Sequence, residues 1–160
     1  MTLRQRLQAG LTAAIRSQDS LRRDVLRMAW AAAYAVEKRE HHELGDDELL
    51  TVLTREVKTR RESVEAFRRG GREDLASREE AEIGVLQELL PQPLGEAELE
   101  ALVAEAVSAT GAASPRDMGK VMGWLSPRTR GRADGRHVSE LVGRALAAAS
   151  ADAPEAGRAR

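Results

Sequence analysis

The segment Pro91-Gln92-Pro93-Leu94-Gly95 interrupts a chain whose other long segments follow helical periodicity. Each proline lacks a backbone N–H and disfavours helical geometry in the residue before it, so no helix continues through this segment. We place a lobe boundary here and expect lobes over residues 1–92 and 93–149, followed by a disordered tail over 150–160. A chain of 160 residues is long enough for two small helical lobes.

Four helices are expected before the boundary, because apolar residues recur there at spacings of three and four in four stretches. Thr2 and Gln5 fit a capping box at the first stretch, and Gly70-Gly71 separates the third from the fourth. The second and third are expected to be capped by Ser20 and by Asp46-Asp47-Glu48. The apolar stripe of the second helix consists of Leu21, Val25, Met28, Ala32 and Val36.

Three helices are expected after the boundary. One begins at Glu96 and ends at Gly111, one follows the cap Ser114-Pro115, and the last opens at Asp134-Gly135. No segment shows a sustained alternation of apolar and polar residues with β-branched side chains, which a strand would show. The predicted fold is therefore all-α, with about four helices in the first lobe and three in the second.

Composition excludes several classes of protein. The chain has no cysteine, which rules out disulfides, zinc–thiolate sites and thiol catalysis. It also lacks the run of about 18 apolar residues that spans a bilayer, and it shows no apolar core of a signal peptide, so we expect a soluble cytoplasmic protein without a membrane partner.

Histidines and carboxylates do not form a recognisable reaction centre in the sequence. His41 and His42 point about 100° apart on a helix, and His137 stands alone. The many carboxylates between Arg72 and Glu105 scatter around helix surfaces without a paired nucleophile. We expect no catalytic residue, no metal site and no cofactor.

The segment from Pro115 to Arg136 is the one that indicates a partner. It holds six basic and two acidic residues, in a chain of formal charge −1. Arginine pairs with phosphate in a bidentate manner, and glycines allow backbone N–H groups to approach the same oxygens, so an anion site is predicted. The candidate binding residues are Arg116, Lys120, Arg128, Arg130, Gly131, Arg132, Gly135 and Arg136. The alternative for the turn is a solvated charged loop whose Asp134 caps the last helix.

Three residues of this segment have two interpretations each. Gly119 and Gly123 lower helix stability relative to alanine. Their presence would be explained either by close packing of a neighbouring helix or by close approach of a ligand, and packing is the favoured interpretation. Trp124 could stack on a base, but burial between helices is the favoured interpretation. Aromatic residues make up only 2% of the chain, so recognition of single strands by successive aromatic faces is disfavoured.

Five strings of this sequence resemble the YqeY family, whose fold is related to the C-terminal tail of GatB, the B subunit of the tRNA-dependent amidotransferase. The similarity extends from Leu3 to about Leu146. The strings are Lys58-Thr59-Arg60-Arg61-Glu62-Ser63 with Phe67, Gly71-Arg72-Glu73-Asp74-Leu75, Leu90-Pro91, Asp117-Met118-Gly119-Lys120-Val121-Met122 and Gly131-Arg132-Ala133-Asp134-Gly135.

The resemblance implies a protein that binds tRNA beside an amidotransferase or an aminoacyl-tRNA synthetase. In the amidotransferase the related tail helps to hold the tRNA, while the chemistry occurs elsewhere, so this chain is expected to be an accessory module without its own active site. Two alternatives stay open. One is a protein–protein adaptor that docks onto such an enzyme, and the other is a carbon–nitrogen ligase with glutamine as amido donor, as the family label implies.

Overall fold

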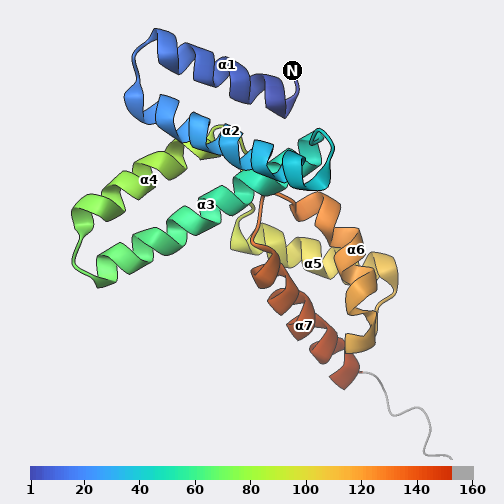
Figure 1. Cartoon of the computed structure of the whole chain (residues 1–160). Coiled ribbons are helices and arrows are strands. Elements are labelled where there is room, and N and C mark those ends of the chain that lie inside the picture. The colour runs from blue at the N-terminus through green and yellow to red at the C-terminus, as the bar shows by residue number, and fades with distance from the viewer. Residues whose placement is uncertain (153–160) are drawn as a thin grey trace, which may run out of the picture. The chain divides into compact units, whose positions relative to one another are not determined.

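The computed structural model describes residues 1–152 and contains only helices within that range (Figure 1). The all-α prediction is confirmed. The chain divides into two compact units, an N-terminal unit over Met1–Pro91 and a C-terminal unit from Gln92 onward. The N-terminal unit holds four helices, α1 (Leu3–Arg16), α2 (Ser20–Glu40), α3 (Asp46–Arg69) and α4 (Glu73–Gln87).

In the N-terminal unit, α1 and α2 form one antiparallel hairpin and α3 and α4 form another (Figure 1). Helices α2 and α3 each contact all three of the other helices, so the core lies around this pair. Leu7, Leu26 and Leu53 are almost completely buried in this core. A Cβ atom at Gly10 would lie 3.3 Å from the Cδ1 atom of Leu26, so the glycine allows α1 to approach α2 closely.

The predicted helix starts are correct in position but not always in the capping residue. Thr2 and Gln5 form the expected capping box of α1. The cap of α2 is Asp19 rather than Ser20, since the Asp19 carboxylate accepts the Arg22 N–H at 3.0 Å. Helix α3 begins after Gly45, and of the predicted capping residues Glu48 accepts the Gly45 N–H at 2.9 Å. The Asp46 carboxylate accepts the Leu3 N–H at 3.1 Å, which joins the starts of α1 and α3.

The predicted apolar stripe of α2 is partly wrong. Met28 is 55% exposed and Leu21 is 36% exposed, whereas Leu26, Ala29 and Ala33 are buried. Because α2 contacts α1 as well as α3 and α4, its buried arc is turned toward α1 relative to the predicted stripe. The position of Leu21 and Met28 at the margin of this arc explains why the periodicity included them.

One charged side chain of the N-terminal unit is buried. Arg60 of α3 donates from Nε to Glu82 of α4 at 3.1 Å and from Nη1 to Glu56 at 2.8 Å, with only 6% of its side chain exposed. Its Nη2 atom lies 4.0 Å from the sulfur of Met28 in α2. Arg60, which belongs to the string Lys58–Ser63, therefore links three helices.

The C-terminal unit consists of α5 (Glu96–Thr110), a short 3-10 helix η1 (Pro115–Asp117), α6 (Met118–Thr129) and α7 (Gly135–Ala151). The three α-helices contact one another around a core in which Val121, Leu125, Val138, Val142 and Leu146 are completely buried. Ser150 and Ala151 belong to α7, so the predicted tail does not begin at Ser150. The rest of that predicted tail, residues 153–160, lies outside the described residues.

Replacing Arg60 with alanine is expected to destabilise the protein strongly. The change would leave the carboxylates of Glu56 and Glu82 without their cation in a partly buried position, a loss of about 3–5 kcal/mol. Urea unfolding of the variant gives this value directly. The exposed neighbour Arg61 is the control, since Arg61→Ala is expected to change stability by less than about 0.5 kcal/mol. Equal effects of the two substitutions would contradict the structural role of Arg60.

Candidate nucleic-acid interface

The start of α6 is fixed by Asp117. Its carboxylate accepts the N–H groups of Ala113 at 2.9 Å and Ser114 at 3.3 Å, which closes the loop before α6. These two hydrogen bonds hold the pKa of Asp117 below its usual value. The arrangement leaves Arg116 and Lys120 exposed at this end of the helix.

One side of α6 is buried and the opposite side is exposed. Val121 and Leu125 are completely buried, and Thr129 continues the buried side with 6% exposure. Residues four apart form two neighbouring rows, which turn slowly about the helix axis because four residues exceed one helical turn. The basic row consists of Arg116 in η1, followed by Lys120, the half-buried Trp124 and Arg128 in α6, and the glycine row consists of Gly119, Gly123 and Pro127. The basic row therefore runs beside a strip of backbone with little side-chain cover.

The glycine row does not pack against another helix. A Cβ atom at Gly119 or at Gly123 would meet nothing within 4 Å, and both residues are exposed. The favoured prediction of helix packing is therefore wrong, because α5 and α7 contact the other side of α6. Pro127 has no N–H to donate to the Gly123 carbonyl oxygen, so the proline and the glycines both lower the stability of α6.

The favoured prediction that Trp124 is buried is met only in part, because the side chain is half-buried. Its half-buried ring packs on the margin of the C-terminal core, and the guanidinium carbon of Arg128 lies 3.6 Å from the centre of the ring. The Nη1 atom of Arg128 also donates to the carbonyl oxygen of Trp124. Sequence reasoning missed this pair, although a tryptophan and an arginine four residues apart on a helix is the signal that indicates it.

The basic turn after α6 depends on a glycine and on Arg132. Gly131 has a φ of +72°, a conformation that L side chains rarely adopt. The carbonyl oxygen of Arg132 accepts the Leu94 N–H at 2.8 Å, and its Nε atom donates to the Gln92 carbonyl oxygen at 2.9 Å. Arg132 thus fastens the segment after Pro91 to the turn, a role that the sequence did not reveal.

The structure brings the predicted site residues together only in part. Arg116 lies in η1, directly before α6, and Lys120 and Arg128 lie in α6, about 12 Å apart along the helix axis. Arg130, Gly131 and Arg132 form the turn, and Gly135 and Arg136 open α7. The predicted set is an elongated surface and not a closed pocket.

Charge is unequally distributed over the C-terminal unit. Helix α5 carries four glutamates and neither lysine nor arginine, whereas α6 carries Lys120 and Arg128 and no acidic residue. Glu96 of α5 pairs with His137 of α7 at 2.8 Å. The unit therefore has an acidic helix and a basic one.

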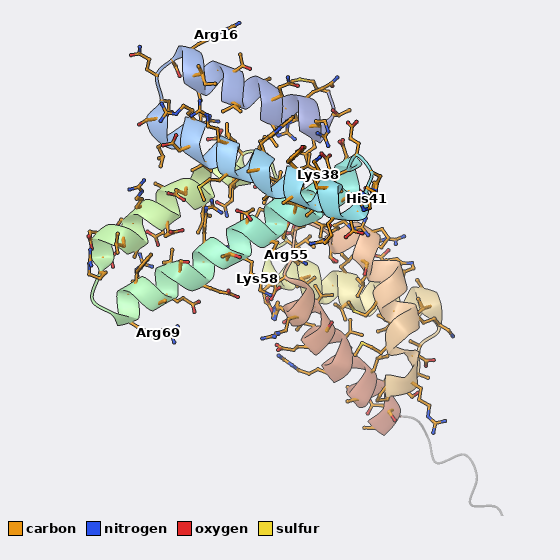
Figure 2. All side chains as sticks on the ribbon, in the orientation of Figure 1. Arg16, Lys38, His41, Arg55, Lys58 and Arg69 are labelled. Carbon is orange, nitrogen blue, oxygen red and sulfur yellow. The ribbon has the colours of Figure 1, made fainter. Side chains whose placement is uncertain are left out.

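The N-terminal unit is of mixed charge. Figure 2 labels six of its basic side chains, of which Arg16 and Arg69 lie at the C-terminal ends of α1 and α3. Basic residues along α3 do not form a continuous row, because Glu62 and Glu65 stand between Lys58 and Arg69. No surface of this unit combines a basic row with bare backbone in the way that α6 does.

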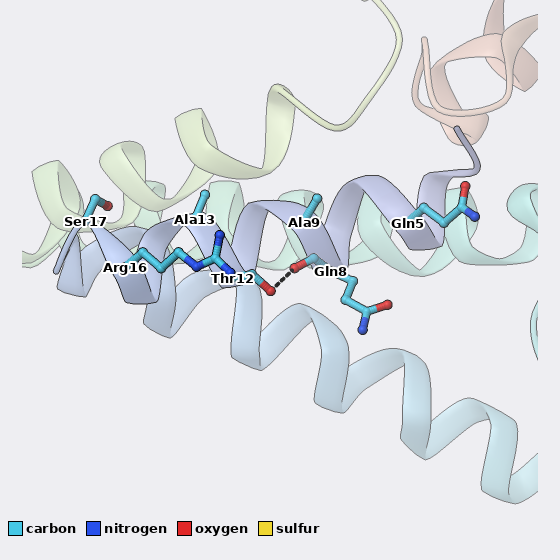
Figure 3. A pocket seen from close by; sticks show the side chains of 7 residues that line it. All are labelled: Gln5, Gln8, Ala9, Thr12, Ala13, Arg16 and Ser17. Carbon is cyan, nitrogen blue, oxygen red and sulfur yellow. Dashed lines mark hydrogen bonds between the residues drawn. The ribbon is translucent and has the colours of Figure 1, made fainter.

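A shallow groove follows the outer side of α1 (Figure 3). Every residue that lines it comes from α1 or directly follows it, and none is a histidine or a carboxylate: Gln5, Gln8, Ala9, Thr12, Ala13, Arg16 and Ser17. Thr12 donates to the Gln8 carbonyl oxygen at 3.0 Å within the helix. The groove has no general acid or base. Within residues 1–152, no group of three or more histidines and carboxylates could hold a metal ion.

The fold and this surface define an all-α protein of two helical units with an exposed basic helix. Residues 4–146 match the family described as Yqey-like protein, so the chain belongs to the YqeY family. It is also 31% identical over 140 residues to "Altered inheritance of mitochondria protein 41, mitochondrial" from Pyrenophora tritici-repentis (strain Pt-1C-BFP). That similarity covers 86% of this chain and 77% of the relative.

The name of the relative assigns that protein to mitochondria, so the cytoplasmic location expected for this chain stays a prediction. Among the described residues, none of the helices combines the length and the apolar character needed to cross a bilayer.

Replacing Gly131 with alanine is expected to destabilise the C-terminal unit by about 1–2 kcal/mol, because an L side chain is strained at its positive φ. Gly135 is the matched control. It lies in the first turn of α7, where a Cβ atom would meet nothing within 4 Å, so Gly135→Ala is expected to be neutral or slightly stabilising. Thermal unfolding of both variants checks the difference, and a Gly131→Ala protein as stable as the wild type would contradict the turn geometry.

Proposed function

We propose that this protein is an accessory module that binds tRNA and holds the folded RNA through its phosphates, without an active site of its own. The observation that carries the proposal is the pair of rows on α6. A row with three cations lies beside a strip of backbone where, among residues 1–152, a Cβ atom at Gly119 or Gly123 would meet nothing within 4 Å. Phosphate groups are the anions that such a surface fits best, because both cations and backbone can approach them closely.

The two glycines support a ligand more strongly than the charges do. Exposed charges are ordinary on helices, but an exposed glycine in the middle of a helix costs about 0.5–1 kcal/mol relative to alanine. At Gly119 and Gly123 no neighbour would obstruct a methyl group. The stability is therefore lost without any benefit within the described residues, which is what a surface that admits a ligand backbone would require.

The family supports tRNA as the particular RNA, because the related tail of the amidotransferase helps to hold tRNA. Membership of the YqeY family carries this argument, and the name of the relative adds no substrate to it. The proposed partners are tRNA and an amidotransferase or aminoacyl-tRNA synthetase that acts on it.

Gly119→Ala and Gly123→Ala are expected to separate stability from function. Gly123→Ala should raise the free energy of unfolding by about 0.5–1 kcal/mol, because alanine favours the helix interior and meets no neighbour, and Gly119→Ala should raise it by less, because Gly119 lies in the first turn of α6. Each should also weaken tRNA binding, because the methyl group covers the backbone strip. Thermal unfolding and a gel-shift titration with total tRNA measure the two effects. Stabilised variants that bind tRNA as the wild type does would remove the glycine row from the site.

Salt dependence tests the phosphate contacts. If three or four phosphates are bound, the slope of log affinity against log salt concentration should be about −2 to −4. Lys120→Ala should reduce the magnitude of the slope by about 1, since it removes one phosphate contact. Arg144→Ala is the control, because Arg144 is exposed in α7 and lies outside both rows. Equal slopes for Lys120→Ala and the wild type would exclude Lys120 from the interface.

The two alternatives predict different results in the same preparations. An adaptor would co-purify with a stable protein partner and would show no salt-sensitive RNA binding, and the acidic helix α5 is the surface that would favour it. A carbon–nitrogen ligase would release ammonia from glutamine as the isolated chain. Either result would contradict the accessory role and support the corresponding alternative.

A further inference from the structure

Arg128 differs from the other cations of the basic row because its side chain is already held in place. Its guanidinium carbon lies 3.6 Å from the centre of the Trp124 ring, and Nη1 donates to the Trp124 carbonyl oxygen. No carboxylate within residues 1–152 forms a salt bridge with it. The side chain is nonetheless exposed. Both contacts are made to the preceding turn of its own helix.

A fixed arginine binds a ligand at lower entropic cost than a mobile one. An exposed arginine ordinarily has many rotamers, and ordering it offsets part of the free energy of binding. Trp124 and its carbonyl oxygen have already ordered Arg128. The guanidinium plane is therefore prepared for a contact that requires a defined orientation.

Arg128 has one guanidinium face that its contacts with Trp124 leave open. One face of the guanidinium lies against the Trp124 ring, so the other face is directed away from it. The Nη1 atom is occupied, which weakens the end-on fork that arginine offers to a phosphate. Guanidinium planes stack on nucleobases, and a base that has left its helix exposes the surface such a plane needs.

We propose that the outer face of Arg128 is a stacking platform for one unpaired nucleobase of the bound RNA. Trp124 lies behind the planar guanidinium and holds its orientation, while Arg116 and Lys120 bind phosphates farther along the same row. This inference rests on the proposed function and adds the substrate feature that the site selects, namely an unpaired base in a folded RNA. Arg128 is in this view a specificity-determining residue.

The stacking role is tested with Arg128→Lys, which keeps the positive charge and removes the plane. The probes are a stem-loop RNA with a loop of unpaired adenosines and a continuous RNA duplex with the same number of phosphates. The expected result is that Arg128→Lys weakens binding of the stem-loop roughly five- to a hundredfold, the loss of one stacked base. Its duplex affinity and its salt slope should stay unchanged, because the charge is retained.

The control variant is Arg144→Lys, which makes the same substitution at an exposed arginine outside the row and should bind both probes as the wild type does. Thermal unfolding verifies that both variants are folded. If Arg128→Lys binds the stem-loop as the wild type does, or loses affinity for both probes equally, Arg128 is no stacking platform and the inference fails alone. If the wild type binds neither RNA in a salt-sensitive manner, the proposed function fails as well.

Discussion

The burial of Val121 and Leu125 fixes the rotation of α6 about its axis, and the character of the exposed surface depends on that rotation. With these two side chains in the C-terminal core, Lys120 and Gly123 lie on the exposed side of α6, whereas Trp124 and Arg128 lie toward the margin of the buried side. A turn of about 100° would bury the tryptophan and expose the methionines. Apolar packing therefore determines where the cations stand, although it contributes no contact to a ligand.

Most of the fold could be predicted from the sequence because helical periodicity, prolines and glycines are local signals. The all-α class and the apolar side of α6 followed from spacing alone. Packing partners are not local, however, and this explains the errors at Gly119 and Gly123 and the incomplete burial of Trp124. The sequence indicates that a helix has a bare side, but only the positions of α5 and α7 reveal that no other helix within residues 1–152 packs on it.

Contacts between distant residues explain the remaining differences. Arg132 was predicted as a ligand residue from its place in an arginine-rich turn, yet its hydrogen bond crosses 40 positions to Gln92. Arg60 belongs to a string that marks the family, but its burial between Glu56 and Glu82 follows from the pairing of α3 with α4. Charged residues of a family motif can thus serve the fold, and charge alone does not identify a binding residue.

The opposition of acidic α5 and basic α6 affects how a polyanion would encounter the C-terminal unit. Helix α5 carries four negative charges and α6 two positive ones, so beyond the Debye length, about 8 Å at physiological salt, this pair of helices exerts no net attraction on a polyanion. The positive potential of α6 acts only on an RNA that has already come near with the correct side. Under the proposed function, such a module would attract only those nucleic acids that approach α6 in a suitable orientation, and this selection would precede any contact with a base.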